Sequence, residues 1–213
     1  MHRFVAVVFT MLLAAAPAWA ALADLGWKLL ELPDKVPARF ALLPDGSIEV
    51  ASAGSVAFLY REAAGGLNAR WRWRVDKAGP ASDPAAKGRD DRPLAVHIWF
   101  PDEAVRSGLR GLLAEMLGYP SYGRVLTYMW AAGEAKGRRF ASPYFNPGQG
   151  AVVVLRDSSD GLGEWHDETV NIAADYRAAF GAEPVAPSYV ALSADSDDLG
   201  GMTLGRVADL DLY

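Results

Sequence analysis

One stretch of this sequence decides its fold class: residues 70–75 read Arg-Trp-Arg-Trp-Arg-Val. Charged and apolar residues alternate along it, and a period of two is that of a β-strand whose two faces meet different surroundings. The pattern predicts a strand that turns Trp71, Trp73 and Val75 toward a core and its arginines toward the other side. We therefore expect a sheet with one buried face.

Strand signals continue on both sides of this stretch. Segments 38–43 and 47–51 flank the turn tripeptide Pro44-Asp45-Gly46 and predict a β-hairpin. Segment 94–100 carries apolar residues on both faces, which is typical of a central strand or of one that faces a ligand site. Further strands are expected over residues 55–60, 125–130, 151–156, 164–172, 189–194 and 206–212, with those that begin at residues 94, 125 and 151 in central positions.

Two short helices are expected between the strands. Leucines and a methionine recur at helical spacing before Gly118 and predict a helix over residues 104–117. Residues 173–180 predict a second helix that ends at Gly181. Many short strands with few helical residues are typical of an all-β fold. We predict a two-sheet β-sandwich, jelly-roll-like, with one or two short inserted helices.

The first twenty residues have the organisation of a secretory signal peptide. Arg3 precedes an apolar run over residues 4–16, and Ala18-Trp19-Ala20 then provides an A-x-A cleavage pattern. The apolar run is shorter than the stretch of about 20 residues that a membrane-spanning helix needs. We predict a signal peptide over residues 1–20, a single domain over residues 21–213, no membrane span after cleavage, and a periplasmic or secreted product.

Composition excludes several classes of function. The 213 residues include no cysteine, which excludes a thiol nucleophile, cysteine-ligated zinc and an iron–sulfur cluster. A net charge of −5 offers no basic footprint for nucleic acid. The chain contains no G-x-S-x-G motif, no phosphate loop and no G-x-G-x-x-G after a strand, so we predict no nucleotide cofactor and no recognisable serine hydrolase site.

Five blocks of residues, taken in order, resemble a known bacterial family. They are residues 71–75 with 88–91 and 97–100; residues 126–130; residues 152–156 with Trp165, Glu168 and Asn171; residues 175–176 with 180–181; and residues 195–197 ahead of Thr203. Their order and spacing resemble the domain-of-unknown-function 3047 family over nearly all of residues 21–213. The resemblance implies an exported β-sandwich, and it implies no particular activity or catalytic residue.

Aromatic residues form the first candidate site, because the apolar face of a pyranose ring stacks on an aromatic ring. His97 shares a strand face with Trp99, and Tyr128 shares one with Trp130. If the two strands are neighbours, a concave aromatic patch results. The candidate ligand-binding residues are His97, Trp99, Tyr128, Trp130 and Trp165, with Arg72, Arg74 and Asp91 as polar partners. The alternative is that the rings fill the core, and we expect Trp130 there and Trp99 nearer the surface.

The arginines at positions 70, 72 and 74 could also bind an anionic polysaccharide, because a guanidinium group binds carboxylate or phosphate through two hydrogen bonds. The alternative is the solvent side of an edge strand, where charge prevents aggregation.

Carboxylates form a second candidate site. Glycoside hydrolysis needs two carboxyl groups about 5 to 9 Å apart, one of them with a raised pKa. The candidate catalytic pair is Asp90 or Asp91 against Glu164 or Glu168. The alternative is that these are solvated loop charges or partners of the arginine stripe.

Metal ligation is a third possibility. Asp195, Asp197 and Asp198 offer the hard oxygen ligands that calcium prefers. They lack the complete twelve-residue calcium-loop spacing and its closing glutamate, and a polar hairpin loop rich in turn formers accounts for the same residues. We therefore predict no bound metal.

Together these observations favour a non-catalytic module that binds carbohydrate or another ligand of the cell envelope. The rival hypothesis is a glycoside hydrolase or polysaccharide lyase on the same scaffold. A third is a structural or protein-partner role in the envelope.

Overall fold

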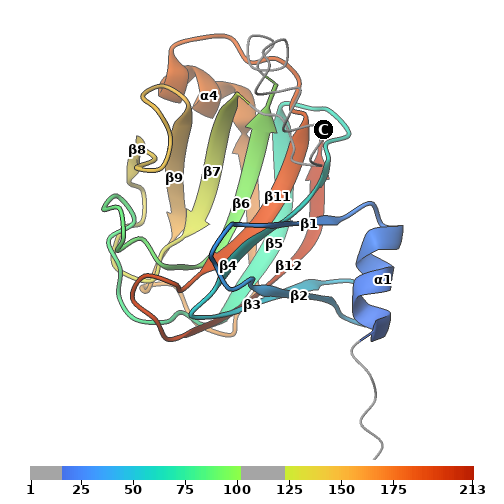
Figure 1. Cartoon of the computed structure of the whole chain (residues 1–213). Coiled ribbons are helices and arrows are strands. Elements are labelled where there is room, and N and C mark those ends of the chain that lie inside the picture. The colour runs from blue at the N-terminus through green and yellow to red at the C-terminus, as the bar shows by residue number, and fades with distance from the viewer. Residues whose placement is uncertain (1–15, 102–122) are drawn as a thin grey trace, which may run out of the picture.

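The computed structural model describes residues 16–101 and 123–213, and these form two β-sheets packed face to face (Figure 1). The seven-stranded sheet has the order β1 (Lys28–Glu31), β4 (Val56–Glu62), β11 (Tyr189–Asp195), β6 (Arg92–Phe100), β7 (Arg124–Trp130), β9 (Gly150–Arg156), β8 (Arg139–Ala141). The five-stranded sheet has the order β10 (His166–Asn171), β5 (Asn68–Lys77), β12 (Met202–Leu212), β3 (Ile48–Ala53), β2 (Arg39–Leu42). The predicted two-sheet β-sandwich is confirmed.

Strand β5 has the alternation that its sequence predicts. Trp71, Trp73 and Val75 are buried in the core between the sheets, while the arginines of the strand lie on the outer face. The strand is not at an edge, since β10 and β12 pair with it on either side. The arginine stripe therefore lies in the interior of its sheet and does not protect a free edge.

Aromatic rings from the two sheets meet in the core. The ring centroids of Trp73 and Trp130 are 5.7 Å apart, and those of Trp71 and Tyr128 are 5.6 Å apart. Both Tyr128 and Trp130 come from β7 in the opposite sheet, so these contacts join the two sheets directly. Edge-to-face and tilted arrangements of this kind add to the free energy that burial of the rings contributes.

Strand β6 is the most buried strand of the seven-stranded sheet, because all nine of its residues are buried. It pairs antiparallel with β11 on one side and with β7 on the other. As expected, strands β6, β7 and β9 all lie inside the sheet, and β7 and β9 are a parallel pair. Val96 and Ile98 face the core, so His97 and Trp99 lie on the outer face of the sheet.

Local signals placed several elements correctly. Strands β2 and β3 form the expected hairpin around Gly46, whose φ of 82° suits a turn glycine. Helix α4 (Ile172–Phe180) begins at Asn171, whose side chain accepts a hydrogen bond from the Ala174 N–H, and ends at Gly181 in the left-handed conformation. The predicted helix over 104–117 lies outside the described residues.

The N-terminal helix α1 (Ala16–Asp24) continues across the predicted cleavage position and packs beside β2 (Figure 1). Its Leu22 is fully buried and belongs to the core cluster. Within the described part of the chain, neither helix has the length and apolar character that crossing a membrane would need.

The aromatic contact between the sheets predicts a large effect of one truncation. Trp130 is 0% exposed, so Trp130→Ala leaves a cavity, and we expect a loss of about 3–5 kcal/mol in the free energy of unfolding. The matched control is Trp165→Ala, because Trp165 lies on the outer face against the guanidinium of Arg72. We expect the control to cost about 1 kcal/mol or less. Urea unfolding curves measure both values, and equal losses would contradict the placement of Trp130 between the sheets.

Candidate functional site

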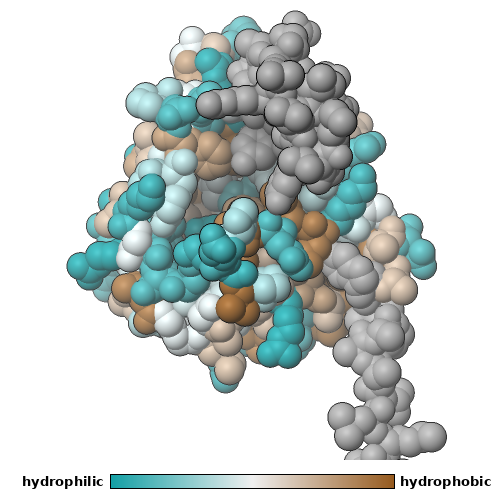
Figure 2. Space-filling model, in the orientation of Figure 1, coloured by the Kyte–Doolittle hydropathy of each residue, from teal (hydrophilic) through white to brown (hydrophobic). Residues whose placement is uncertain are grey.

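A cleft of about 580 Å³ lies over the outer face of the seven-stranded sheet. Its floor is formed by side chains of β4, β6, β7, β9 and β11, and its walls by the chain around residues 30–35, 84–90, 142–145 and 195–198. Figure 2, in the orientation of Figure 1, shows hydrophilic and hydrophobic residues side by side on this surface. The cleft accordingly has an apolar part and a polar part.

The apolar part is built from aromatic and aliphatic side chains. Trp99 and Phe58 line it, with their ring centroids 6.1 Å apart. The ring centroids of Tyr60 and Tyr189 lie 5.5 Å and 6.1 Å from that of Trp99. Trp99 is only 2% exposed, although it lines the cleft. Trp99 lies outside the core cluster between the sheets, on the outer face of its sheet. Its side chain is nevertheless buried, so the expectation of a ring nearer the surface is not met, and the ring is not an open platform.

The polar part is built around Arg92, which is buried at the start of β6. Its Nη1 lies 3.4 Å from Oδ2 of Asp90 and 3.2 Å from Oδ2 of Asp195. A buried guanidinium needs such partners, because an uncompensated charge away from water is strongly destabilising. Arg92 thus brings two carboxyl groups, from residues more than a hundred positions apart in the sequence, to one end of the cleft.

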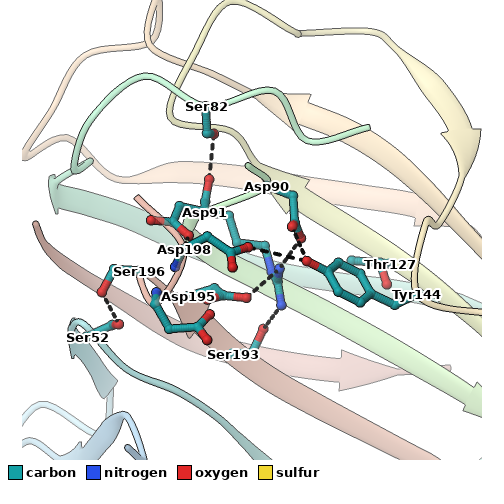
Figure 3. A network of polar contacts seen from close by, with 12 residues as sticks. Ser52, Ser82, Asp90, Asp91, Thr127, Tyr144, Ser193, Asp195, Ser196 and Asp198 are labelled. Carbon is teal, nitrogen blue, oxygen red and sulfur yellow. Dashed lines mark hydrogen bonds and ion pairs between the residues drawn. The ribbon is translucent and has the colours of Figure 1, made fainter. Parts of the chain in front are cut away.

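A tyrosine from the loop before β9 completes this end. The hydroxyl of Tyr144 donates a hydrogen bond to Asp90 and lies 3.3 Å from Oδ2 of Asp198 (Figure 3). Tyr144 is 49% exposed, and the ammonium of Lys87 lies 5.4 Å from the centroid of its ring. The cleft therefore has a half-exposed aromatic ring at its opening, directly beside carboxylates.

Burial changes the proton affinity of these carboxyl groups. It raises the pKa of Asp90, although Tyr144 and Arg92 act in the opposite direction. It also raises the pKa of Asp195 to about 7, where Asp197 adds to the effect and Arg92 opposes it. The pKa of Asp197 is lowered, because hydrogen bonds from Asp195 and Lys35 outweigh its burial. Asp195 can thus hold a proton near neutral pH.

Asp91 has a structural role next to the cleft. Its carboxylate accepts hydrogen bonds from the N–H groups of Asp198 (3.1 Å) and Leu199 (2.9 Å), and its carbonyl accepts one from the hydroxyl of Ser82 (Figure 3). These bonds hold the loop between β11 and β12 against the segment before β6. Asp91 therefore positions residues 195–198, which form one wall of the cleft, and does not itself line the cleft.

Three acidic side chains lie close together next to this end of the cleft. Ligand oxygens of Asp91, Asp195 and Asp197 lie within 4.8 Å of one another. The sequence singled out Asp195, Asp197 and Asp198 as residues with the oxygen ligands that calcium prefers. In the structure, Asp91 takes the place of Asp198 in this group. Lys35 pairs with Asp197 and Arg92 with Asp195, so protein cations already compensate two of these carboxylates.

The aromatic residues singled out in the sequence are divided between two faces. The strands that carry them are neighbours, as the hypothesis required, but the register places His97 opposite Thr127 and Trp99 opposite Val125. Opposite residues share a face, so Tyr128 and Trp130 point into the core. The aromatic patch of four residues is therefore not formed.

The remaining candidate binding residues lie on the other side of the sandwich. The ring of Trp165 packs against the guanidinium of Arg72 at 4.6 Å and of Arg74 at 5.8 Å, over the outer face of the five-stranded sheet. Arg74 pairs with Asp76, and Arg72 lies 4.0 Å from Asp209. These groups are separated from the cleft by the full thickness of the sandwich.

The predicted carboxylate pairs are not brought together in the cleft. Asp90 lines it, whereas Glu164 and Glu168 are not among its lining residues. Glu168 instead accepts hydrogen bonds from Trp73 Nε1 (3.0 Å) and from Arg156 Nε (2.6 Å) at the margin of the core. The carboxyl group that shares Arg92 with Asp90 is that of Asp195.

Sequence reasoning missed several residues of the cleft. Phe58 lies on β4 and Thr127 on β7, two strands that the sequence predicted. Given the correct register between strands, the alternation of side chains could have placed both residues on the outer face of the sheet. Tyr144 and Lys35 come from irregular segments, where no local pattern indicates what a side chain will contact.

The raised pKa of Asp195 predicts a specific dependence of stability on pH. Because the pKa is about 7 in the folded protein and about 3.9 in an unfolded chain, the folded state binds this proton more tightly. The resulting stabilisation is complete below about pH 4 and is lost as the pH rises to about 7. We expect wild type to lose more unfolding free energy than Asp195→Asn between about pH 4 and pH 8. Urea unfolding at each pH measures this difference. The control is Asp83→Asn, because the Asp83 carboxylate is exposed. Parallel profiles for wild type and Asp195→Asn would contradict the assignment.

Comparison with known proteins gives a family and likenesses of fold. No curated protein matches the chain. The xyloglucanase domain of NopAA from Sinorhizobium fredii, solved with cellobiose, is 11% identical with a TM-score of 0.48, covering 88% of this chain and 93% of that one. The K2 cleaved adhesin domain of Lys-gingipain is 13% identical with a TM-score of 0.37, covering 88% and 90%. Likeness at this level leaves the function open. The family model described as protein of unknown function (DUF3047) matches residues 25–211, and the chain belongs to that family.

Proposed function

We propose that the cleft on the seven-stranded sheet binds a carbohydrate and that the protein is a non-catalytic binding module. The observation that carries this proposal is the arrangement of the cleft, in which aromatic rings and carboxylates face one enclosed space. A pyranose ring has apolar faces and a rim of hydroxyl groups, so it needs both kinds of surface at once. The volume of about 580 Å³ lies within the usual range for small-ligand sites.

The polar groups of the cleft match the hydroxyls of a sugar. Asp90 and Asp198 accept hydrogen bonds, and a sugar hydroxyl can donate to either. The half-exposed ring of Tyr144 lies next to both carboxylates and offers its face to a sugar ring. The predicted signal peptide supports an address in the envelope or the medium, where such glycans occur.

Binding is tested with neutral tetrasaccharides of several linkages: cellotetraose, chitotetraose, maltotetraose and mannotetraose, titrated by calorimetry. We expect at least one of them to bind wild type and Tyr144→Ala to bind it about tenfold more weakly, because a stacking surface next to the carboxylates is lost. The fold should be retained, since the ring is half-exposed.

Trp165→Ala is the matched control, an aromatic truncation on the opposite face, and we expect it to bind as wild type does. Loss of binding in this variant with Tyr144→Ala unchanged would move the site to the five-stranded sheet. Absence of binding to the whole panel would contradict the proposal and favour a structural or protein-partner role.

A second candidate function is glycoside hydrolysis in the same cleft. It is favoured by Asp90 and Asp195, two buried carboxyl groups with raised pKa that share Arg92. Paired carboxyl groups of this kind are what the reaction needs.

The two candidates differ in one measurement. Incubation of the same tetrasaccharides with wild type should release no new reducing ends if the protein only binds. Release of reducing ends by wild type, abolished in both Asp90→Asn and Asp195→Asn, would replace the binding function by the hydrolytic one.

A further inference from the structure

Four buried polar side chains form a continuous chain of hydrogen bonds along the floor of the cleft. Arg92 Nη2 lies 3.3 Å from Ser193 Oγ, which lies 2.8 Å from His97 Nε2. His97 Nδ1 in turn lies 2.9 Å from Thr127 Oγ1. The chain crosses three neighbouring strands, from β6 to β11, back to β6 and on to β7. In the view of Figure 3, Ser193 lies below the carboxylates and Thr127 lies to their right.

The direction of the first hydrogen bonds follows from the chemistry of Arg92. A guanidinium group only donates, so Ser193 Oγ must accept from it. Within residues 16–101 and 123–213, the Ser193 hydroxyl has hydrogen-bond partners in Arg92 and His97 alone. A fully buried hydroxyl needs an acceptor for its hydrogen, and only the His97 ring nitrogen can provide one. Ser193 therefore donates to His97 Nε2.

The tautomer of His97 is then determined. A neutral imidazole that accepts at Nε2 carries its hydrogen on Nδ1, and that hydrogen points to Thr127 Oγ1. Burial lowers the pKa of His97 well below its usual range, and the charge of Arg92 acts in the same direction. A protonated ring would also direct a second donor at Ser193, which already accepts from Arg92. The ring thus stays neutral, with its hydrogen on Nδ1.

Thr127 is the last residue of this chain of hydrogen bonds. Its oxygen accepts the hydrogen bond from His97, so its own hydroxyl hydrogen is not needed for that contact. Thr127 lines the cleft between the apolar side chains of Val125 and Met129. We propose that Arg92, Ser193 and His97 orient the Thr127 hydroxyl so that it donates a hydrogen bond into the cleft, to an acceptor oxygen of the bound ligand. Thr127 is the residue that contacts the ligand, and the other three are positioning residues.

This inference deepens the proposed function and rests on it where the acceptor is a sugar oxygen. The carboxylates at the polar end can only accept hydrogen bonds when ionised, whereas Thr127 supplies a donor on the floor. The carboxylates and Thr127 together require a ligand that donates hydrogen bonds at the polar end and accepts one on the floor of the cleft. A sugar does both, through its hydroxyl groups and its ring oxygen. A ligand with cationic donors alone would leave Thr127 without an acceptor.

The direction of these hydrogen bonds is tested without any ligand, by ¹⁵N-detected NMR of the histidine rings in the full protein. The protein contains three histidines, His2, His97 and His166. The variants His2→Gln and His166→Gln identify the signals of those two rings, and the remaining signals belong to His97. We expect His97 to be the neutral Nδ1–H tautomer from about pH 5 to pH 8. In Ser193→Ala the link to Arg92 is removed, and we expect a mixture of tautomers. An Nε2–H tautomer in wild type, or an unchanged tautomer in Ser193→Ala, would overturn the inference.

The donor itself is tested with dimethyl sulfoxide, a small probe that only accepts hydrogen bonds. Titration should produce a saturable NMR shift at the Thr127 methyl group in wild type. Thr127→Ser keeps the hydroxyl and should bind the probe in the cleft as wild type does, whereas Thr127→Val keeps the volume and should bind it about fivefold more weakly. Equal affinity of the valine and serine variants would overturn the inference. Both measurements are independent of the tetrasaccharide titrations, so failure of the proposed function and failure of this inference are distinguishable.

Discussion

The packing of Trp73 against Trp130 between the two sheets is the contact on which the rest of the site depends. Side chains alternate along a strand, so burying Tyr128 and Trp130 in the core turns Val125, Thr127 and Met129 to the outer face. The same alternation in β6 puts Val96 and Ile98 inside and His97 outside. The floor of the cleft is therefore a consequence of how the aromatic core is filled. A slip of one residue in β7 would exchange the two sets, which is why the core and the candidate site cannot be varied independently.

Arg92 has a comparable role at the polar end of the cleft. Its guanidinium contacts two carboxyl groups and one hydroxyl, from Asp90, Asp195 and Ser193. Removal of a buried partner from such a network leaves a charge without compensation, which is strongly destabilising. The network also determines where protons lie, because the cation opposes the rise in the pKa of Asp195 and disfavours the charged form of His97. Structure and proton positions at this end of the cleft thus depend on a single side chain.

The two outer faces of the sandwich have different characters. On the five-stranded sheet, arginines of β5 pair with carboxylates, as Arg70 does with Asp211 at 2.9 Å, and Trp165 covers Arg72. The three arginines of β5 at positions 70, 72 and 74 each have a carboxylate partner there. On the seven-stranded sheet, the buried carboxyl groups of Asp90 and Asp195 line a cleft together with aromatic rings. Burial of polar groups has a free-energy cost that an exposed surface does not bear, and this cost sets the cleft face apart from the outer face of the five-stranded sheet.

The sequence by itself determined the strands, their alternation and the class of fold. Residues 70–75, the hairpin at Gly46 and the helix that ends at Gly181 are local patterns, and local backbone preferences and a single buried face are enough to specify them. It did not determine which face of β6 is inside, because both faces are apolar and either could be buried. Nor did it show that Asp195 would meet Asp90 or that Tyr144 would reach both Asp90 and Asp198. Those contacts depend on the order and register of strands distant in sequence, and many weak interactions across the two sheets decide them together, so only the tertiary structure could.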